Sequence, residues 1–174
     1  MTEIRKHLDT DLSLSQPETL FQVLLKSCST CKDNTAYIYR AGDDEIEVKY
    51  SKVFEDVLLL ARAFSDKGVA ADDRVMFLSD NRYAWIVTDL AIMSLGAVTV
   101  PRGSDTPPPE LHFIMQNSSC AHLVVESIEL LEQHRDIIKK ISGLKTVFVM
   151  IGPTLQSLFG KTYSYQDLLK LYSD

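Results

Sequence analysis

The stretch Ser79–Pro101, SDNRYAWIVTDLAIMSLGAVTVP, predicts a helix followed by a turn and a strand. Ser79 or Asp80 can cap the helix by accepting hydrogen bonds from the free N–H groups of its first turn. Between residues 84 and 95 almost every side chain is apolar. A helix that is apolar on nearly all sides is buried on nearly all sides, so we expect this helix to be the most completely buried one.

The end of the helix and the strand behind it are also marked in the sequence. Gly96 is the residue best able to take the left-handed backbone conformation just past a helix end. Residues 97–100 then predict a short buried strand, which Pro101 ends. A strand, helix and strand of this length form a βαβ unit, and ligands usually bind in the loops past its strand ends.

The rest of the chain repeats this spacing. Runs typical of strands begin about 23 to 25 residues apart, with a helical segment in each gap; they are residues 74–78, 97–100, 122–125 and 146–150. This spacing is typical of successive βαβ units. Two of the runs, Val75–Leu78 and Val147–Met150, are apolar without alternation, as in strands covered on both faces. We therefore predict an α/β fold with a mostly parallel, doubly wound sheet flanked by helices.

The N-terminal part differs. Residues 1–16 are polar and without periodicity, which predicts a flexible lead-in or a subunit contact. Pro17 opens a helix, and the runs 35–39 and 46–50 predict a β-hairpin with an acidic turn. Ser51 is placed to cap the following helix.

Composition excludes several function classes. The chain has 174 residues, of which 45% are hydrophobic and 24% charged, as in an average globular domain. A net charge of −6 argues against a nucleic-acid partner. Residues 84–100 are the only candidate membrane span, but Asp89 and Gly96 interrupt them, so we expect no transmembrane segment. Without a secretory signal, we expect a cytoplasmic location, with peripheral attachment to a membrane as an alternative.

Cys28, Cys31 and Cys120 give no disulfide framework. The first two form a CxxC motif, but at the far end of a predicted helix, where the dipole does not lower a thiol pKa. A zinc site would need two more ligands at short spacing. We interpret the cysteines as incidental and predict no metal site.

The pattern NRxxWIxxDLAxxxxGAVxVP, from Asn81 to Pro101, resembles the second core motif of the AMP-forming adenylate synthetases, in the form found in long-chain fatty acyl-CoA synthetases. Other segments resemble further family motifs in the right order: Thr19-Leu20, Thr35–Ile38, Tyr50–Ala61, Gly68–Val75 and Glu110–Val125. Asp72 departs from the usual family glycine and Ala84 from the glutamate usual in the long-chain group. The resemblance covers roughly residues 17 to 150.

The resemblance implies that residues 17–174 are the N-terminal α/β subdomain of a fatty acid–CoA ligase. The family uses ATP, Mg²⁺ and coenzyme A to convert a fatty acid to acyl-adenylate and then to acyl-CoA. Its Ser/Thr/Gly-rich phosphate loop ending in Lys is absent between Met1 and Asp174. We therefore expect scaffold and channel wall, no catalytic residue and no cofactor bound to this segment alone. The expected partners are the remaining synthetase chain and the fatty acid substrate; the alternative is a free-standing scaffold or dimerisation module, including a homodimer.

The loop 101–106 is the best candidate for a binding site, because it follows one predicted strand and precedes a helix. Arg102 and the amides of Gly103 and Ser104 could bind an anion, or form only a rigid turn with a surface arginine. In the family this loop lies close to the coenzyme A path. The resemblance adds Arg135, on the helix after the third parallel strand. Neither arginine has an obvious carboxylate partner in its own segment, so we predict that both bind coenzyme A.

Two further patterns are interpreted as structural. The segment Gly152–Thr162, GPTLQSLFGKT, has seven residues between its glycines, where a phosphate-binding loop has four. His112, His122 and His134 have no Ser, Cys or carboxylate at a spacing that suggests a triad or a metal. We expect each of these histidines to be structural or solvated.

Overall fold

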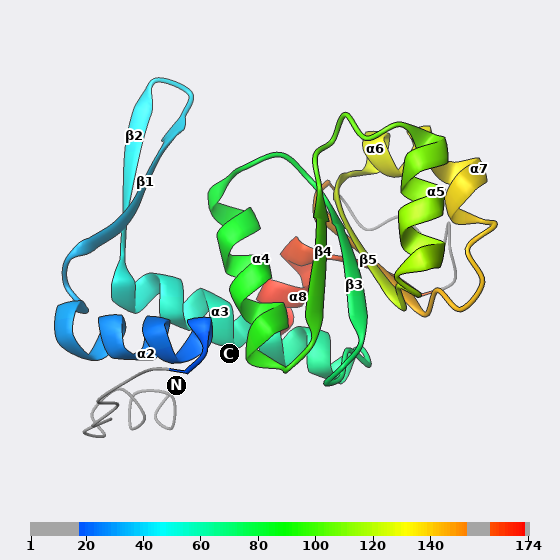
Figure 1. The fold of residues 1–174 in the computed structure, drawn as a ribbon. Helices are drawn as coiled ribbons and strands as arrows, with labels where there is room; N and C mark the ends of the chain where they lie inside the picture. The colour runs from blue at the N-terminus through cyan, green and yellow to red at the C-terminus, as the bar shows by residue number, and fades with distance from the viewer. Residues whose placement is uncertain (1–17, 153–160, 173–174) are drawn as a thin grey trace.

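The computed structural model describes residues 18–152 and 161–172; the expected lead-in and Pro17 lie outside these ranges. The described elements, in chain order, are α2 Leu20–Cys31, β1 Thr35–Ala41, β2 Asp44–Lys49, α3 Tyr50–Asp66, β3 Arg74–Leu78, α4 Tyr83–Ser94, β4 Val98–Arg102, α5 Pro108–Asn117, β5 His122–Ser127, α6 Ile128–Gln133, α7 Arg135–Ile138, β6 Thr146–Ile151, β7 Lys161–Ser164 and α8 Tyr165–Tyr172. Strands β1 and β2 form the expected antiparallel hairpin, which projects away from the main sheet (Figure 1).

The main sheet has five parallel strands in the order β4-β3-β5-β6-β7. The chain runs from β3 outward to β4 and then crosses back over β3 to β5. Helix α4, which follows β3, and helix α6, which follows β5, lie on opposite sides of the sheet (Figure 1). The carboxyl ends of β3 and β5 therefore flank the topological switch point, where doubly wound sheets bind ligands. The predicted doubly wound α/β fold is confirmed; β7 was not predicted.

Each central strand supplies two hydrophobic cores. In β3, Val75 and Phe77 face the helices α2, α3, α4 and α8, whereas Met76 and Leu78 face α5, α6 and α7. These four side chains are almost completely buried. Alternate residues point to opposite faces of a strand, so a strand covered on both faces is apolar throughout. This explains the unbroken apolar runs in the sequence.

The expected helix caps are wrong. Helix α4 begins after Arg82 and has no side-chain cap. Ser79 and Asp80 lie too far upstream, and their side chains contact Glu126 and Ser104 instead. Ser51 already lies within the first turn of α3, so it does not cap that helix either.

Helix α4 is also less buried than its sequence predicts. Its fully buried residues form one stripe, Val87, Thr88, Ala91 and Ile92, and its other residues are half-buried. Trp85 is one of these, and its ring stacks on Phe77 with 5.2 Å between centroids. An apolar groove of about 330 Å³ lies between α4 and α2. Helix α3, which has seven buried residues, is the more deeply buried helix.

Strand β4 is an edge strand, half exposed, and continues through Pro101 to Arg102. The expectation that it is buried and ends at Pro101 is wrong. The N–H of Val98 and the C=O of Arg102 both point to β3 and its flanking residues. Along a strand, the backbone groups of successive residues point alternately to the two neighbouring strand positions. The backbone of Pro101 therefore points away from β3, and its missing N–H breaks no hydrogen bond between β4 and β3. Gly96 has the expected positive φ, of 72°.

The CxxC motif lies at the end of α2 as expected, and both of its thiols are free. Burial raises the pKa of Cys28 and of Cys120 to about 11, which keeps these thiols protonated and unreactive. Part of the segment 152–162 lies outside the described residues. Lys161 and Thr162 begin β7 rather than a helix, so they lack the helix N-terminus of a phosphate-binding loop.

Candidate ligand site at the carboxyl edge of the sheet

Glu126, near the end of β5, occupies the switch point between β3 and β5. Its Oε1 lies 2.6 Å from an Nη of Arg82. Its Oε2 accepts hydrogen bonds from the Ser79 hydroxyl at 3.1 Å and from the Asp80 backbone N–H at 2.8 Å. Both charged side chains are partly exposed, at 31% for Arg82 and 19% for Glu126. One carboxylate therefore fixes the loop between β3 and α4.

Asp80 connects this loop to the one that follows β4. Its Oδ1 accepts hydrogen bonds from the Ser104 hydroxyl at 2.6 Å and from the Ser104 backbone N–H at 3.1 Å. These bonds hold the pKa of Asp80 below its usual value. The Ser104 amide therefore already donates to Asp80, and an external anion would have to replace that carboxylate.

A pocket of about 250 Å³ opens beside these loops. Its lining residues come from the ends of β3 and β4 and from α4: Ser79, Asp80, Asn81, Trp85, Pro101, Arg102 and Gly103. Within the described ranges, no hydrogen bond or ion pair involves the exposed Arg102 guanidinium. Gly103 leaves little room, since a Cβ there would lie 2.7 Å from an Asp105 carboxylate oxygen. The pocket thus combines an aromatic wall with one unpaired positive charge.

Arg135 is not part of this pocket. It begins the short helix α7, in the layer that covers the other face of the sheet, and α7 packs against α5 (Figure 1). Its Nη1 lies 3.3 Å from a carboxylate oxygen of Glu132. The expectation that Arg135 lacks a carboxylate partner in its own segment is wrong. Of the proposed site residues, the structure brings together Arg102, Gly103 and Ser104 only.

Sequence reasoning missed Arg82 and Glu126. One signal was available, because Glu126 directly follows an apolar run and should lie at the same sheet edge as Ser79. Their contact joins residues 44 positions apart, which no local pattern predicts.

The described residues also bear on metals and membranes. Among the described residues, no group of three or more His, Cys, Asp and Glu side chains could hold a metal ion. No helix between residues 18 and 152 or 161 and 172 is long and apolar enough to cross a membrane.

Known proteins share this architecture. The long-chain-fatty-acid-CoA ligase of Archaeoglobus fulgidus superposes with a TM-score of 0.72 at 22% identity, over 88% of this chain and 30% of that one. A putative long-chain-fatty-acid CoA ligase from Rhodopseudomonas palustris gives 0.72 at 20% identity, over 86% of this chain and 36% of the other. At this level of identity the similarity establishes the fold.

Sequence comparison establishes the family. The chain is 25% identical over 165 residues to a chloroplastic long-chain-fatty-acid–[acyl-carrier-protein] ligase of Arabidopsis thaliana, over 92% of this chain and 23% of the relative. It is 34% identical over 76 residues to the long-chain-fatty-acid–CoA ligase FadD15 of Mycobacterium tuberculosis, over 44% of this chain and 12% of the relative. The chain thus spans about a quarter or less of these curated relatives. The model of the AMP-binding enzyme family matches residues 24–167, and the chain belongs to that family.

Proposed function

We propose that this chain is the N-terminal α/β subdomain, residues 17–174, of a long-chain fatty acid–CoA ligase. The complete enzyme would convert ATP and a fatty acid into acyl-adenylate and diphosphate. It would then transfer the acyl group from the adenylate to coenzyme A and release AMP. The long-chain fatty-acid ligases among the relatives support this reaction class. The observation that carries the proposal is Arg102, which lines the pocket without a partner for its guanidinium among the described residues, at the carboxyl ends of the strands, where such sheets bind ligands.

The pocket suits coenzyme A better than ATP or the fatty acid. Arg102 offers a cation for a phosphate group, and the ring of Trp85 offers an apolar wall. By contrast, the sequence has no Ser/Thr/Gly-rich loop for the ATP phosphates. ATP and Mg²⁺ would therefore be held by the rest of the enzyme. This segment would contribute the sheet and part of the channel wall, with no catalytic group and no cofactor bound to it alone.

Two assays test this division of roles. The 174-residue chain, supplied with palmitate and ATP, should release no diphosphate above a protein-free blank. The complete reading frame that carries it should form acyl-CoA when coenzyme A is added. Diphosphate release by the 174-residue chain would disprove the proposal that this segment alone is inactive. A complete protein without ligase activity would disprove the proposed ligase function.

The complete enzyme also tests the arginines. A charge-assisted bond to phosphate contributes about 1.5–3 kcal/mol, so Arg102→Ala should raise the apparent coenzyme A constant roughly ten- to a hundredfold. Arg135→Ala should do the same if it also binds coenzyme A, although its pair with Glu132 makes it the weaker candidate. Constants for ATP and fatty acid should hardly change. Arg40→Ala, on the exposed end of β1, is the matched control. An unchanged coenzyme A constant for Arg102→Ala would mean that Arg102 is a solvated surface arginine without a role in binding.

The alternative is a non-catalytic scaffold or dimerisation module. One observation favours it: Leu20 and Val23 of α2 are 62% and 44% exposed beside the apolar groove. Such a surface suits contact with another protein or with the rest of the same enzyme. Sedimentation at several concentrations would detect a homodimer. The cytoplasmic location stays a prediction, and fractionation of cells would test it.

A further inference from the structure

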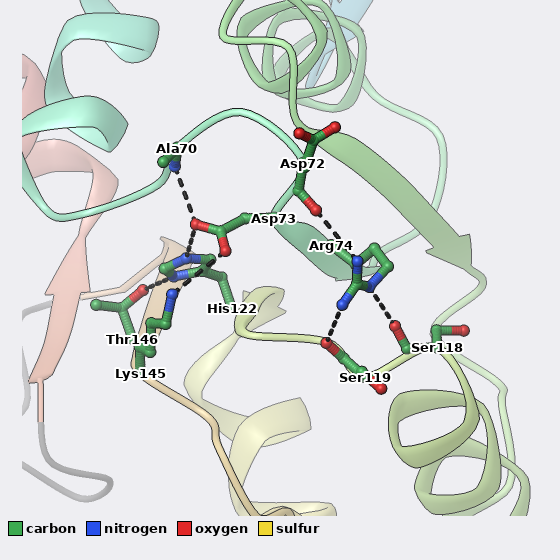
Figure 2. Close-up of polar contacts among 9 residues, drawn as sticks. All are labelled: Ala70, Asp72, Asp73, Arg74, Ser118, Ser119, His122, Lys145 and Thr146. Carbon is green, nitrogen blue, oxygen red and sulfur yellow. Dashed lines mark hydrogen bonds and ion pairs between the residues drawn. The ribbon is translucent and has the colours of Figure 1, made fainter.

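A second polar cluster lies at the opposite, amino edge of the sheet (Figure 2). It consists of Asp73, His122, Lys145 and Thr146. Asp73 directly precedes β3, His122 is the first residue of β5, and Thr146 is the first residue of β6. The cluster therefore joins three neighbouring strands at their starts.

The imidazole of His122 is at the centre of this cluster and is fully buried. Its Nε2 lies 3.1 Å from Asp73 Oδ2, and its Nδ1 forms a short hydrogen bond with the hydroxyl of Thr146. Asp73 also accepts bonds from the Ala70 backbone N–H at 3.0 Å and from Lys145 Nζ at 3.2 Å. Figure 2 shows these side chains converging on the ring.

The partners define the protonation state of the ring. The ionised Asp73 carboxylate only accepts hydrogen bonds, so Nε2 must carry a proton. Nδ1 can then accept the hydroxyl proton of Thr146, and a neutral imidazole satisfies every partner. A protonated imidazole would donate hydrogen bonds from both nitrogens. The hydroxyl proton of Thr146 would then lose the acceptor Nδ1 while it remains buried. That loss makes the charged ring unfavourable in this cluster.

The charged groups that face the ring act in opposite directions. Asp73, from the turn before β3, favours the imidazolium, whereas Lys145, from the turn before β6, opposes it. Burial is the largest influence and lowers the pKa of His122 below its usual value. Asp73 is already shared with Lys145 and Ala70, so its charge is not reserved for the ring.

We propose that Asp73, His122 and Thr146 form a proton-sensitive clamp, which joins the amino ends of β3, β5 and β6 while the imidazole is neutral. Protonation of His122 weakens the clamp and loosens this edge of the sheet. The clamp is independent of the proposed ligase function, because it lies at the edge opposite the ligand site.

The direction of the pH effect follows from linkage. An unfolded histidine titrates near pH 6.5, and the folded pKa of His122 is lower. Between these two values the unfolded chain binds more protons, so stability falls as the pH falls. The contribution is fully present above about pH 6.5 and is lost as the pH falls through the folded pKa. Asp73, whose pKa is lowered from 3.8, loses its contribution only in stronger acid.

Urea unfolding of the 174-residue chain between pH 5 and 8 tests the clamp. One linked proton changes the unfolding constant by up to about tenfold per pH unit, and His122→Gln should remove the part of the pH dependence that His122 contributes. His112→Gln, on α5, is the matched control and should keep the wild-type profile. His134→Gln is measured separately, since burial also lowers the pKa of His134. Thr146→Ser keeps the hydroxyl and should retain the wild-type profile.

A direct measurement covers the case in which His122→Gln fails to fold. In wild-type protein at pH 7.5, nitrogen-15 NMR of the His122 ring should show a protonated Nε2 and an unprotonated Nδ1. Its titration midpoint should lie below that of a model histidine peptide. A midpoint at or above the peptide value would overturn the proposal, as would an unchanged pH profile in a folded His122→Gln variant.

Discussion

Polar networks lie at both ends of the parallel strands, which we call the amino edge and the carboxyl edge of the sheet, and the two networks differ in burial and in pairing. At the amino edge, His122 and Thr146 are almost completely buried, and both ring nitrogens have partners. At the carboxyl edge, Glu126 and Arg82 are partly exposed, and Arg102 has no side-chain partner among the described residues. A polar network whose groups are all paired adds rigidity, whereas an unpaired charge beside a pocket remains available to a ligand. The difference favours a stabilising role for the amino edge and agrees with the binding role proposed for the carboxyl edge.

The largest expected effect is at the amino edge. His122→Leu would leave the buried Thr146 hydroxyl without its acceptor and the partly exposed Asp73 carboxylate without one of its donors. We expect a loss of about 2–4 kcal/mol in the free energy of unfolding, measured in urea at pH 7.5. His112→Leu should stay within about 0.5 kcal/mol. Equal losses in both variants would mean that the cluster has no special role in stability.

Trp85, which lines the carboxyl-edge pocket, comes next. A fully buried Trp→Ala change costs about 3–5 kcal/mol, but half-burial should limit the loss for Trp85→Ala to about 2 kcal/mol. Trp85→Phe, which can keep the stack on Phe77, should cost less than about 1 kcal/mol. Calorimetric melting of the three proteins checks this order. A loss as large as that of His122→Leu would show that the pocket wall is part of the core.

Glu126→Gln should have a smaller effect. It removes the charge that pairs with Arg82 but keeps an oxygen that can accept from Ser79 or Asp80. We expect a loss of about 1–2 kcal/mol, measured by guanidinium unfolding in low salt. Glu132→Gln, which breaks the exposed pair with Arg135, should cost at most about 0.5 kcal/mol. If the two variants behave alike, Glu126 does not fix the loop.

The smallest effect is expected at Arg102. Its exposed side chain has no partner to lose within the described residues, so Arg102→Ala should change the free energy of unfolding by less than about 0.5 kcal/mol. Thermal melts of wild type and variant should overlap. If Arg102→Ala clearly stabilised the protein, the difference between the two edges would be larger than expected, because the unpaired charge of Arg102 would then lower the stability of the fold.

Much of the fold could be predicted, because each central strand is a short apolar run at regular spacing. The exceptions have physical causes. Strand β7, KTYS, is short and half polar, so it resembles a loop. The run AVTV at residues 97–100 predicts a buried strand, yet β4 lies at the edge. Position within a sheet depends on the order in which the strands pair, and that order is not encoded locally.

The candidate site could be predicted only in part. Arg102 and Gly103 were placed at the carboxyl edge because they follow a βαβ unit, and the structure places them there. The bond between Asp80 and Ser104 spans 24 residues, and that between Asp73 and His122 spans 49. Such pairs are set by tertiary packing. The histidine pattern alone therefore gave no sign that His122 would have a carboxylate partner.

Pro101 has a consequence for the solubility of the chain. An exposed edge strand offers a row of free N–H and C=O groups, on which a strand of a neighbouring molecule can assemble. The backbone groups of Val98 and Arg102 point to β3 and its flanking residues, so those of Thr99 and Pro101 point away from β3, and proline supplies no N–H group. An added strand would find its hydrogen-bond ladder interrupted at Pro101. Among the described residues no strand pairs with the outer side of β4, and the proline that follows the GAVTV run therefore disfavours edge-to-edge aggregation there.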